Sequence, residues 1–335
     1  MRNSANRQMM VVSSPKGPLR ETHIAMRTGL MPELRPGQVL VRVHMLSIDP
    51  ILRFIFDHDS PLNSRLKPGD VMGGWGMCEV VDPNGTALPK GTIAWLWCGW
   101  QDYFAVDAVA VQPVVDDGAP MSYHLGLLGS TGLAGYHGVM AIGQPRAGQT
   151  VLVSAAAGAT GSIAAQLARV SGAHVVGVAG SADKLRYLID NGIADAAVSH
   201  RSPRFAADLR AACPDGIDLF FDGVGGSVLE HAYPLMNILG KIVICGAMAA
   251  YDGSKPDPLA YMDSFTILMK RISLIGFRIM DEEEHWPAWR AHLLSLVADR
   301  KIKVIEDVTD GLENAPTALI RLLAGDTIGK AIVKL

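Results

Sequence analysis

The stretch Val151-Leu152-Val153-Ser154-Ala155-Ala156-Ala157-Gly158-Ala159-Thr160-Gly161-Ser162 decides the fold of this chain. Its first four residues form a strand candidate, Ala155, Gly158 and Gly161 have the spacing A-x-x-G-x-x-G, and Ile163–Val170 continues with a helical pattern. Such a turn lets a pyrophosphate approach the backbone, and the amides at the helix N-terminus bind its oxygens. The stretch therefore predicts a dinucleotide site, although packing turns that bind nothing share this spacing.

Strand and helix candidates alternate after this turn. The helix candidate Ala182–Asn191 ends at Gly192. The strand candidates are His174–Val178, Ala196–Val198, Leu219–Phe221, Lys241–Cys245 and Ile272–Phe277. This alternation predicts an α/β fold with a doubly wound parallel sheet, a Rossmann domain with helices on both faces.

The residues before about Tyr123 are instead rich in short strands. Val39–Val43 and Ile93–Trp97 are strand candidates, and Lys67–Asp70 and Pro89–Thr92 have turn composition. This spacing is typical of a compact, partly open β-barrel. Beyond the alternating region, the chain closes with a strand candidate, a helix candidate and a last strand candidate: Val304–Val308, Ala315–Ala324 and Lys330–Leu335.

The composition is that of a globular protein. The 335 residues are 49% hydrophobic and 19% charged, which predicts about two domains with ample cores. The net charge is −3 and no long basic run occurs, so nucleic acid is not an expected partner. Val151–Ala168 lacks charge, but it contains the glycine turn, and no signal-peptide core follows Arg7. We therefore expect a soluble, cytoplasmic protein that does not bind membranes, with its four scattered cysteines in the core.

The end of the second Rossmann strand indicates which dinucleotide binds. An NAD site usually has an acid there, which accepts from the ribose hydroxyls, whereas this strand ends Val178-Ala179-Gly180-Ser181. The missing acid permits a 2′-phosphate, and Lys184 lies just beyond to pair with it. Asp183 is expected in the first helical turn, pointing away. The sequence thus favours NADP(H), and a solvated surface lysine is the alternative interpretation of Lys184.

No pattern of metal ligands is evident. The chain has no H-E-x-x-H and no C-x-x-C, and Ser47–Pro50 follows the first long strand, where a zinc cysteine might stand. His44, His124 and His137 are dispersed single histidines. The sequence argues against catalytic zinc, and so against ordinary alcohol oxidation.

Several further motifs occur in a fixed order along the chain. They are Gly99–Tyr103, Thr131–Tyr136, Phe221–Gly226, Cys245–Ala247, Asp310–Pro316 and Gly329-Lys330. Together with the glycine turn they resemble the medium-chain dehydrogenase/reductase superfamily over nearly the whole chain. The similarity is to its zinc-free branch of NADPH-dependent alkenal and prostaglandin reductases, which includes curcumin reductases.

The resemblance implies a GroES-like catalytic domain over residues 1–124, completed by about 302–335, and a Rossmann NADP-binding domain over 125–301. It implies pyrophosphate contacts at residues 159–162, 2′-phosphate contacts at Lys184, and nicotinamide contacts at residues 245–251 and 277–278. It also implies a homodimer. The implied cofactor-binding residues are Thr131, Ala159, Thr160, Gly161, Ser162, Lys184, His200, Gly223, Cys245, Gly246, Ala247, Tyr251, Phe277, Arg278 and Thr327.

Some positions depart from the family pattern. His200 stands where the family often has a tyrosine near the 2′-phosphate, and a histidine can still donate to a phosphate. Gly223 and Thr327 each replace an asparagine. Ile51 replaces an aromatic residue near the substrate.

The implied reaction is reduction of a carbon–carbon double bond conjugated to a carbonyl, in enals and enones, by NADPH. Without zinc, the oxyanion needs a hydrogen-bond donor. Tyr251 is the catalytic candidate, because it follows the strand end Cys245-Gly246-Ala247, at the edge where ligands bind. Three alternatives stay open: a quinone reductase of the same superfamily, a non-catalytic NADP(H)-binding sensor, and a zinc alcohol dehydrogenase.

Overall fold

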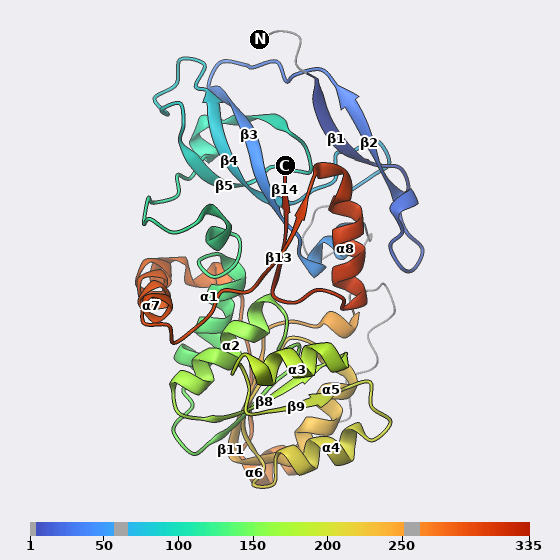
Figure 1. Cartoon of the computed structure of the whole chain (residues 1–335), viewed down its shortest axis with the longest axis vertical. Coiled ribbons are helices and arrows are strands. Elements are labelled where there is room, and N and C mark those ends of the chain that lie inside the picture. The colour runs from blue at the N-terminus through green and yellow to red at the C-terminus, as the bar shows by residue number, and fades with distance from the viewer. Residues whose placement is uncertain (1–4, 57–65, 251–261) are drawn as a thin grey trace. The chain divides into compact units, whose positions relative to one another are not determined.

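The computed structural model describes residues 5–56, 66–250 and 262–335. Two compact units divide these residues (Figure 1). Unit 1 consists of the described residues up to 125 and of residues 307–335, and unit 2 consists of the described residues from 126 to 306. Each unit has its own sheet and hydrophobic core.

Unit 2 is built on a six-stranded sheet in which every pairing is parallel. The spatial order is β12-β11-β10-β7-β8-β9. The strands are β7 (Thr150–Val153), β8 (His174–Ala179), β9 (Ala196–Ser199), β10 (Ile217–Asp222), β11 (Met236–Ile244) and β12 (Ser273–Gly276). This order confirms the predicted doubly wound sheet.

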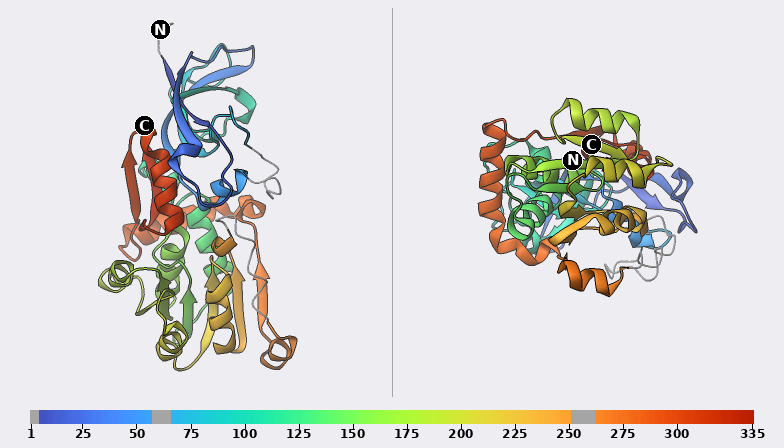
Figure 2. Two further views of the ribbon diagram at one scale, coloured as in Figure 1. Left: turned by 90° about the vertical axis from the view of Figure 1, so that its right-hand side faces the viewer. Right: turned by 90° about the horizontal axis from the view of Figure 1, so that it is seen from below.

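Helices cover both faces of this sheet (Figures 1 and 2). They are α1 (Ser130–Tyr136), α2 (Ala159–Val170), α3 (Ala182–Asp190), α4 (Phe205–Ala212), α5 (Gly226–Ala232), α6 (Ser264–Lys270) and α7 (Trp286–Ala298). On one face, Leu152 and Phe220 pack with Phe205 of α4. On the other, Gly177 lies beneath Leu188 of α3. The central strands β7, β8 and β10 are buried on both faces, which explains why they are mainly apolar.

The strand order reverses between β7 and β10. These two strands pair directly, with Val151 opposite Leu219 and Val153 opposite Phe221. Ligands of open α/β sheets bind beyond the carboxyl ends of the strands at such a reversal. The glycine turn after β7 lies at this point of unit 2.

Unit 1 is an antiparallel β structure centred on β3. Its elements are β1 (Asn6–Val11), β2 (Ile24–Gly29), β3 (Gln38–Ser47), β4 (Trp75–Asp82), β5 (Ile93–Trp97), β6 (Tyr103–Asp107), β13 (Glu306–Asp310), α8 (Ala315–Ala324) and β14 (Lys330–Lys334). One edge of β3 pairs with β4. The other edge pairs first with β6 and then with β14. The last strand of the chain therefore extends a sheet that begins with residue 38.

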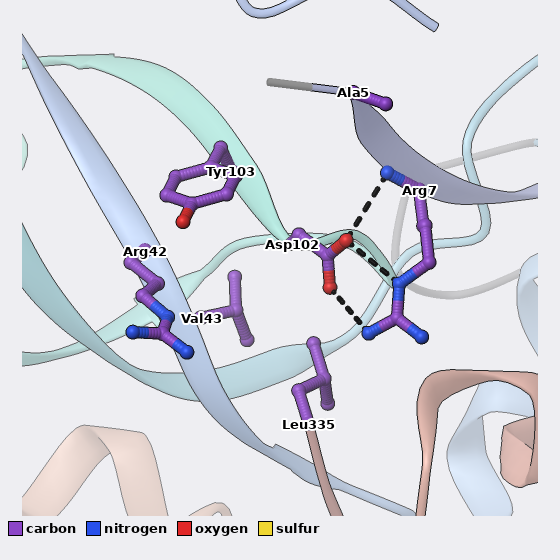
Figure 3. A pocket seen from close by; sticks show the side chains of 7 residues that line it. All are labelled: Ala5, Arg7, Arg42, Val43, Asp102, Tyr103 and Leu335. Atoms are coloured by element: carbon purple, nitrogen blue, oxygen red, sulfur yellow. Dashed lines mark hydrogen bonds and ion pairs between the residues drawn. The ribbon is translucent and has the colours of Figure 1, made fainter. Parts of the chain in front are cut away.

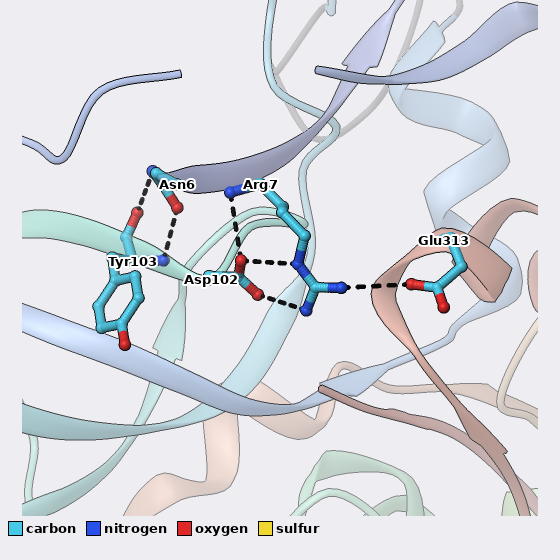
Figure 4. A network of polar contacts seen from close by, with 5 residues as sticks. All are labelled: Asn6, Arg7, Asp102, Tyr103 and Glu313. Atoms are coloured by element: carbon cyan, nitrogen blue, oxygen red, sulfur yellow. Dashed lines mark hydrogen bonds and ion pairs between the residues drawn. The ribbon is translucent and has the colours of Figure 1, made fainter. Parts of the chain in front are cut away.

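The second segment of unit 1, residues 307–335, is also tied to β1. Arg7 forms a bidentate ion pair with Asp102, at 2.9 Å from Nε to Oδ2 and 3.0 Å from Nη2 to Oδ1, and its Nη1 lies 3.4 Å from Glu313 (Figure 4). The two side-chain atoms of Asn6 exchange hydrogen bonds with the backbone of Tyr103. These contacts hold three distant parts of the chain together.

Several element boundaries differ from the sequence-based prediction; strand β11, for example, begins at Met236 rather than Lys241. Helix α2 begins at Ala159 rather than Ile163, so the last residues of the glycine turn form its first turn. Strand β13 begins at Glu306 rather than Val304. The Gln166 side chain accounts for this later start of β13. Its amide oxygen accepts from the Lys303 backbone nitrogen at 2.7 Å, and its amide nitrogen donates to the Lys303 carbonyl at 3.1 Å. These bonds anchor the segment before β13 to α2.

Within the described ranges, no helix combines the length and the apolar composition that a membrane crossing requires. The four cysteines carry free thiols; Cys78, Cys98 and Cys213 are buried in the core as expected, whereas Cys245 is partly exposed.

Candidate functional site

The glycine turn places the first turn of α2 against the strand that precedes it. A Cβ atom on Gly161 would lie 2.3 Å from the Ala155 carbonyl oxygen, so only glycine allows this close approach. Gly158 is the N-cap residue, and α2 has no acid in its first turn. The first backbone amides of a helix lack carbonyl partners within it and attract anions. The turn therefore fits a pyrophosphate.

The predicted pyrophosphate residues are not equivalent. Ala159, Thr160 and Gly161 form the first turn, where the amides point out of the helix. The Ser162 amide instead donates to Gly158 at 3.0 Å, and its hydroxyl donates to the Ala159 carbonyl at 3.2 Å. Ser162 thus stabilises the turn itself.

A buried carboxylate holds the neighbouring strand end. Asp222, at the end of β10, accepts from Ser154 Oγ at 2.7 Å and from the amides of Val224 and Gly225 at 2.9 and 3.0 Å. Burial raises the pKa of Asp222, and the hydrogen bonds from Gly225, Val224 and Ser154 oppose that rise. The same Ser154 oxygen accepts from the Gly223 amide at 2.8 Å. Asp222 therefore fixes the shape of both strand ends at the reversal point.

The segments after β10 and β11 lie against each other. Gly246 is confined, since a Cβ there would be 3.0 Å from the Gly223 carbonyl oxygen, whereas a Cβ on Gly223 would meet nothing within 4 Å. Burial, and then the Asp222 carboxylate, raises the pKa of Cys245 to about 12, so its thiol is protonated at neutral pH. Ala247 accepts from the Ala250 amide at 2.9 Å. The structure brings these nicotinamide candidates together with Gly223.

The end of β8 carries the candidates for the 2′-phosphate. Ser181 caps α3 by accepting from the backbone amide of Lys184 at 3.4 Å. His200 follows β9, and its amide donates to the Ala179 carbonyl at 3.2 Å. Asp183 is 84% exposed and pairs with Arg186 at 3.5 Å, as expected for an acid that points away. The Lys184 charge acts on His200, whose ring lies beside Gly180, so the corner around Gly180 is basic.

The other candidates are more dispersed. Thr131 donates its hydroxyl to the Gly126 carbonyl at 3.1 Å, and Phe277 packs edge-on against His137 with ring centroids 5.0 Å apart. Arg278 is exposed and lies 3.9 Å from Asp281. Thr327 belongs to unit 1, where it is buried between α8 and β14. The catalytic candidate Tyr251 lies outside the described residues.

Each histidine considered as a metal ligand faces one carboxylate. His44 lies 2.9 Å from Glu79, His124 3.5 Å from Asp117, and His137 3.8 Å from Glu282. Over the described part of the chain, no group of three or more histidine, cysteine or acidic side chains is arranged to hold a metal ion.

A pocket of about 250 Å³ in unit 1 is not a candidate site. It is lined by Ala5, Arg7, Arg42, Val43, Asp102, Tyr103 and Leu335 (Figure 3). The Arg7 and Asp102 side chains at this pocket already pair with each other. None of its lining residues belongs to unit 2, which carries the glycine turn.

Two residues of the site have no counterpart among the sequence-based candidates. Asp222 lies in the motif Phe221–Gly226, but its role depends on Ser154, 68 residues earlier. Arg201 follows His200 directly, and its guanidinium lies beside Gly180. The available signal for Arg201 was a second basic residue next to a position assigned to the 2′-phosphate.

A doubly wound sheet with a glycine turn at its reversal point and a basic corner at the next strand defines a dinucleotide-binding protein. A family model described as zinc-binding dehydrogenase matches residues 159–298, and one described as the N-terminal domain of oxidoreductase matches residues 7–114.

Known proteins match over nearly the full length. The chain is 34% identical to the NADPH-dependent curcumin reductase of Escherichia coli, over 98% of this chain and 96% of the relative. It is 37% identical to prostaglandin reductase 1 of Bos taurus, over 92% and 93%. The crystal structure of CurA from Vibrio vulnificus in complex with NADPH matches with a TM-score of 0.91 at 32% identity, over 98% of both chains. The chain belongs to the medium-chain dehydrogenase/reductase superfamily.

Proposed function

We propose that this protein is an NADPH-dependent reductase of carbon–carbon double bonds conjugated to a carbonyl, acting on enals and enones without zinc. The observation that carries the proposal is the glycine turn at the reversal point beside a strand end that has basic side chains and no acid. The similarity to curcumin and prostaglandin reductases supports the substrate class.

Unit 2 offers groups suited to the pyrophosphate and to the 2′-phosphate of NADP(H). The amides of Ala159, Thr160 and Gly161 would hold the pyrophosphate, and Lys184 and His200 the 2′-phosphate. The remaining candidates of unit 2 would lie along the cofactor toward the nicotinamide: Thr131, Gly223, Cys245, Gly246, Ala247, Phe277 and Arg278. When bound, NADPH supplies the hydride for the β-carbon of the substrate. The role of the protein is to orient the substrate, exclude water and stabilise the charge that develops on the carbonyl oxygen.

Tyr251 is the proposed donor to that oxygen. Tyr251→Phe is expected to lower kcat on an enone by about 100-fold, since removing one oxyanion donor costs roughly that much, while the Kd of NADPH stays near the wild-type value. Steady-state kinetics and fluorescence titration measure the two quantities. Tyr103→Phe, in unit 1, is the matched control and should leave both unchanged. An unaltered kcat in Tyr251→Phe would remove this residue from the mechanism.

His200 makes the affinity for the 2′-phosphate depend on pH. Partial burial, Arg201 and Lys184 lower its pKa below 6.5 in the cofactor-free protein. A bound phosphate favours the protonated ring and raises that pKa. The benefit is therefore full below the free-protein pKa and is lost as pH rises through the bound-state pKa.

The Kd of 2′,5′-ADP should accordingly rise more steeply with pH in the wild type than in His200→Asn. Calorimetric titrations over roughly pH 5.5 to 8.5 measure this difference, and the titration of the phosphate itself, with a pKa of about 6, is common to both proteins. Parallel curves for the two proteins would mean that His200 does not face the phosphate.

A substrate panel separates the proposed activity from its alternatives. NADPH oxidation is followed with enals, enones and quinones, and NADH serves as the cofactor control. The proposal expects turnover of enals and enones with NADPH. Turnover of quinones alone would favour a quinone reductase. Binding of NADPH without turnover would favour a sensor. This outcome is worth testing because Gly223 replaces the asparagine of the family pattern and so lacks its side-chain amide. A preference for NADH would overturn the cofactor assignment.

We also propose a cytoplasmic homodimer. The free cysteines support the compartment, because disulfides persist in oxidising environments. The dimer is supported by β12, which forms one edge of the unit 2 sheet. Large exposed apolar side chains lie on β12, β11 and α6: Leu274, Ile238, Leu239, Phe265, Leu268 and Met269. Natural proteins normally cover or charge such an edge.

Leu274→Lys is therefore expected to convert a dimer into a monomer, because charges would repel across a symmetric pair of edges. Sedimentation analysis measures the state. Val109→Lys, which replaces a 96% exposed apolar residue of unit 1, is the control. A wild-type protein that sediments as a monomer at micromolar concentration would contradict the dimer.

A further inference from the structure

Two basic side chains lie over one backbone position at the end of β8. A Cβ atom placed on Gly180 would lie 3.0 Å from Nε2 of His200 and 3.2 Å from Nε of Arg201. The imidazole and the guanidinium thus share the space above Gly180. This is the strand end at which an NAD site usually carries an acid.

The local fold brings these side chains to that place. Strands β8 and β9 run parallel, with Ala179 opposite Ser199, so the chain leaves β9 beside Gly180. The His200 amide is bound to the Ala179 carbonyl, and the Arg201 amide donates to Ser199 Oγ at 3.2 Å. The backbone of both residues is therefore fixed where the third Rossmann strand ends.

Positive charges gather at this corner among the residues that the structure describes. Arg201 and, to a lesser degree, Lys184 act on His200 and lower its pKa, in addition to partial burial. The Arg201 guanidinium, which lies beside Gly180, is therefore a second positive charge of the corner, in addition to Lys184. Asp183 is exposed and paired with Arg186. The N-terminus of α3, which begins at Ala182, adds its partial positive charge.

We propose that Arg201 is a specificity-determining residue that pairs with the 2′-phosphate of NADPH, together with Lys184. The inference rests on the proposed cofactor and extends it to a residue that the family pattern did not supply. A guanidinium forms two parallel hydrogen bonds to a phosphate, whereas the 2′-hydroxyl of NADH offers no such partner. Arg201 therefore selects between the two cofactors.

Arg201→Gln tests this assignment by binding rather than by activity. Calorimetry is used with 2′,5′-ADP and 5′-AMP, and fluorescence titration with NADPH and NADH. The Kd of 2′,5′-ADP and of NADPH should rise at least tenfold, which corresponds to about 1.4 kcal/mol. The Kd of 5′-AMP and of NADH should change by less than about twofold, and Arg201→Lys should recover part of the loss because it keeps the charge without the fork.

A neighbouring arginine provides the control. Arg204 lies in the same loop, is 79% exposed and is 3.9 Å from Asp208, so Arg204→Gln should leave all four dissociation constants unchanged. The proposal is overturned if Arg201→Gln binds 2′,5′-ADP within twofold of wild type. It is also overturned if the variant loses affinity for both members of each ligand pair equally, since that indicates a structural role. Failure of the wild type itself to prefer 2′,5′-ADP over 5′-AMP would instead contradict the cofactor assignment.

Discussion

Replacing Gly161 with alanine will weaken NADPH binding by at least about tenfold and destabilise unit 2 by roughly 1–3 kcal/mol, the usual cost of forcing an extra methyl group into a packed interior. The new Cβ atom would lie 2.3 Å from the carbonyl oxygen of Ala155 and 2.8 Å from its carbonyl carbon. Both are backbone atoms and no side chain can move aside to accommodate it. Helix α2 must therefore shift away from the turn, and the amides that face the pyrophosphate shift with it.

Gly276→Ala, at the end of β12, is the matched control for this variant. It makes the same chemical change at the same edge of the sheet, but its Cβ atom would meet nothing within 4 Å. Fluorescence titration with NADPH and thermal unfolding should show a near wild-type protein. If Gly161→Ala binds NADPH as tightly as Gly276→Ala, the turn does not hold the cofactor.

Removing the buried charge of Lys330 should have the largest effect on stability. Lys330 is 3% exposed, and its Nζ donates to Asp49 Oδ1 at 2.5 Å and to the Ile48 carbonyl at 3.2 Å. Lys330→Met leaves the Asp49 carboxylate without its partner, and breaking a buried pair costs about 3–5 kcal/mol. Ser47, which donates to the other Asp49 oxygen at 2.5 Å, supplies no charge.

Urea unfolding followed by tryptophan fluorescence suits this test, because Trp75, Trp95, Trp97 and Trp100 all belong to unit 1. The double variant Lys330→Met/Asp49→Asn should recover at least half of the loss, since it removes the unpaired charge. Lys301→Met breaks the exposed pair with Asp299, at 3.2 Å, and should cost no more than about 1 kcal/mol. Equal losses in the free energy of unfolding for Lys330→Met and Lys301→Met would show that the buried pair stabilises the protein no more than an exposed one.

The sequence was most informative where structure is local. The strand, turn and helix over residues 150–170 follow from consecutive residues, as do α3 with its stop at Gly192 and α8 over Ala315–Ala324. Apolar strands alternating with helices admit few topologies, so the doubly wound sheet could be predicted. The preference of the β8 end for a 2′-phosphate could also be predicted, from the missing acid and from Lys184 just beyond the strand.

Features that depend on residues far apart in the sequence could not be predicted. Lys330 and Asp49 are 281 positions apart, and nothing local to either announces the ion pair. The start of β13 depends on Gln166, 137 residues before Lys303. A basic residue after a strand is ordinarily solvated, so the sequence gives no reason to assign Arg201 to the site. The assignment depends on the position of its guanidinium beside Gly180.

The most direct test of the proposed reaction is the fate of the transferred hydride. The protein is incubated with an enone and NADPH that carries deuterium at both C4 positions, and the product is examined by NMR spectroscopy. A double-bond reductase gives a saturated ketone with deuterium on the carbon β to the carbonyl. Deuterium on the carbonyl carbon of an unsaturated alcohol would contradict the proposed reaction, because the chain would then reduce carbonyl groups rather than conjugated double bonds.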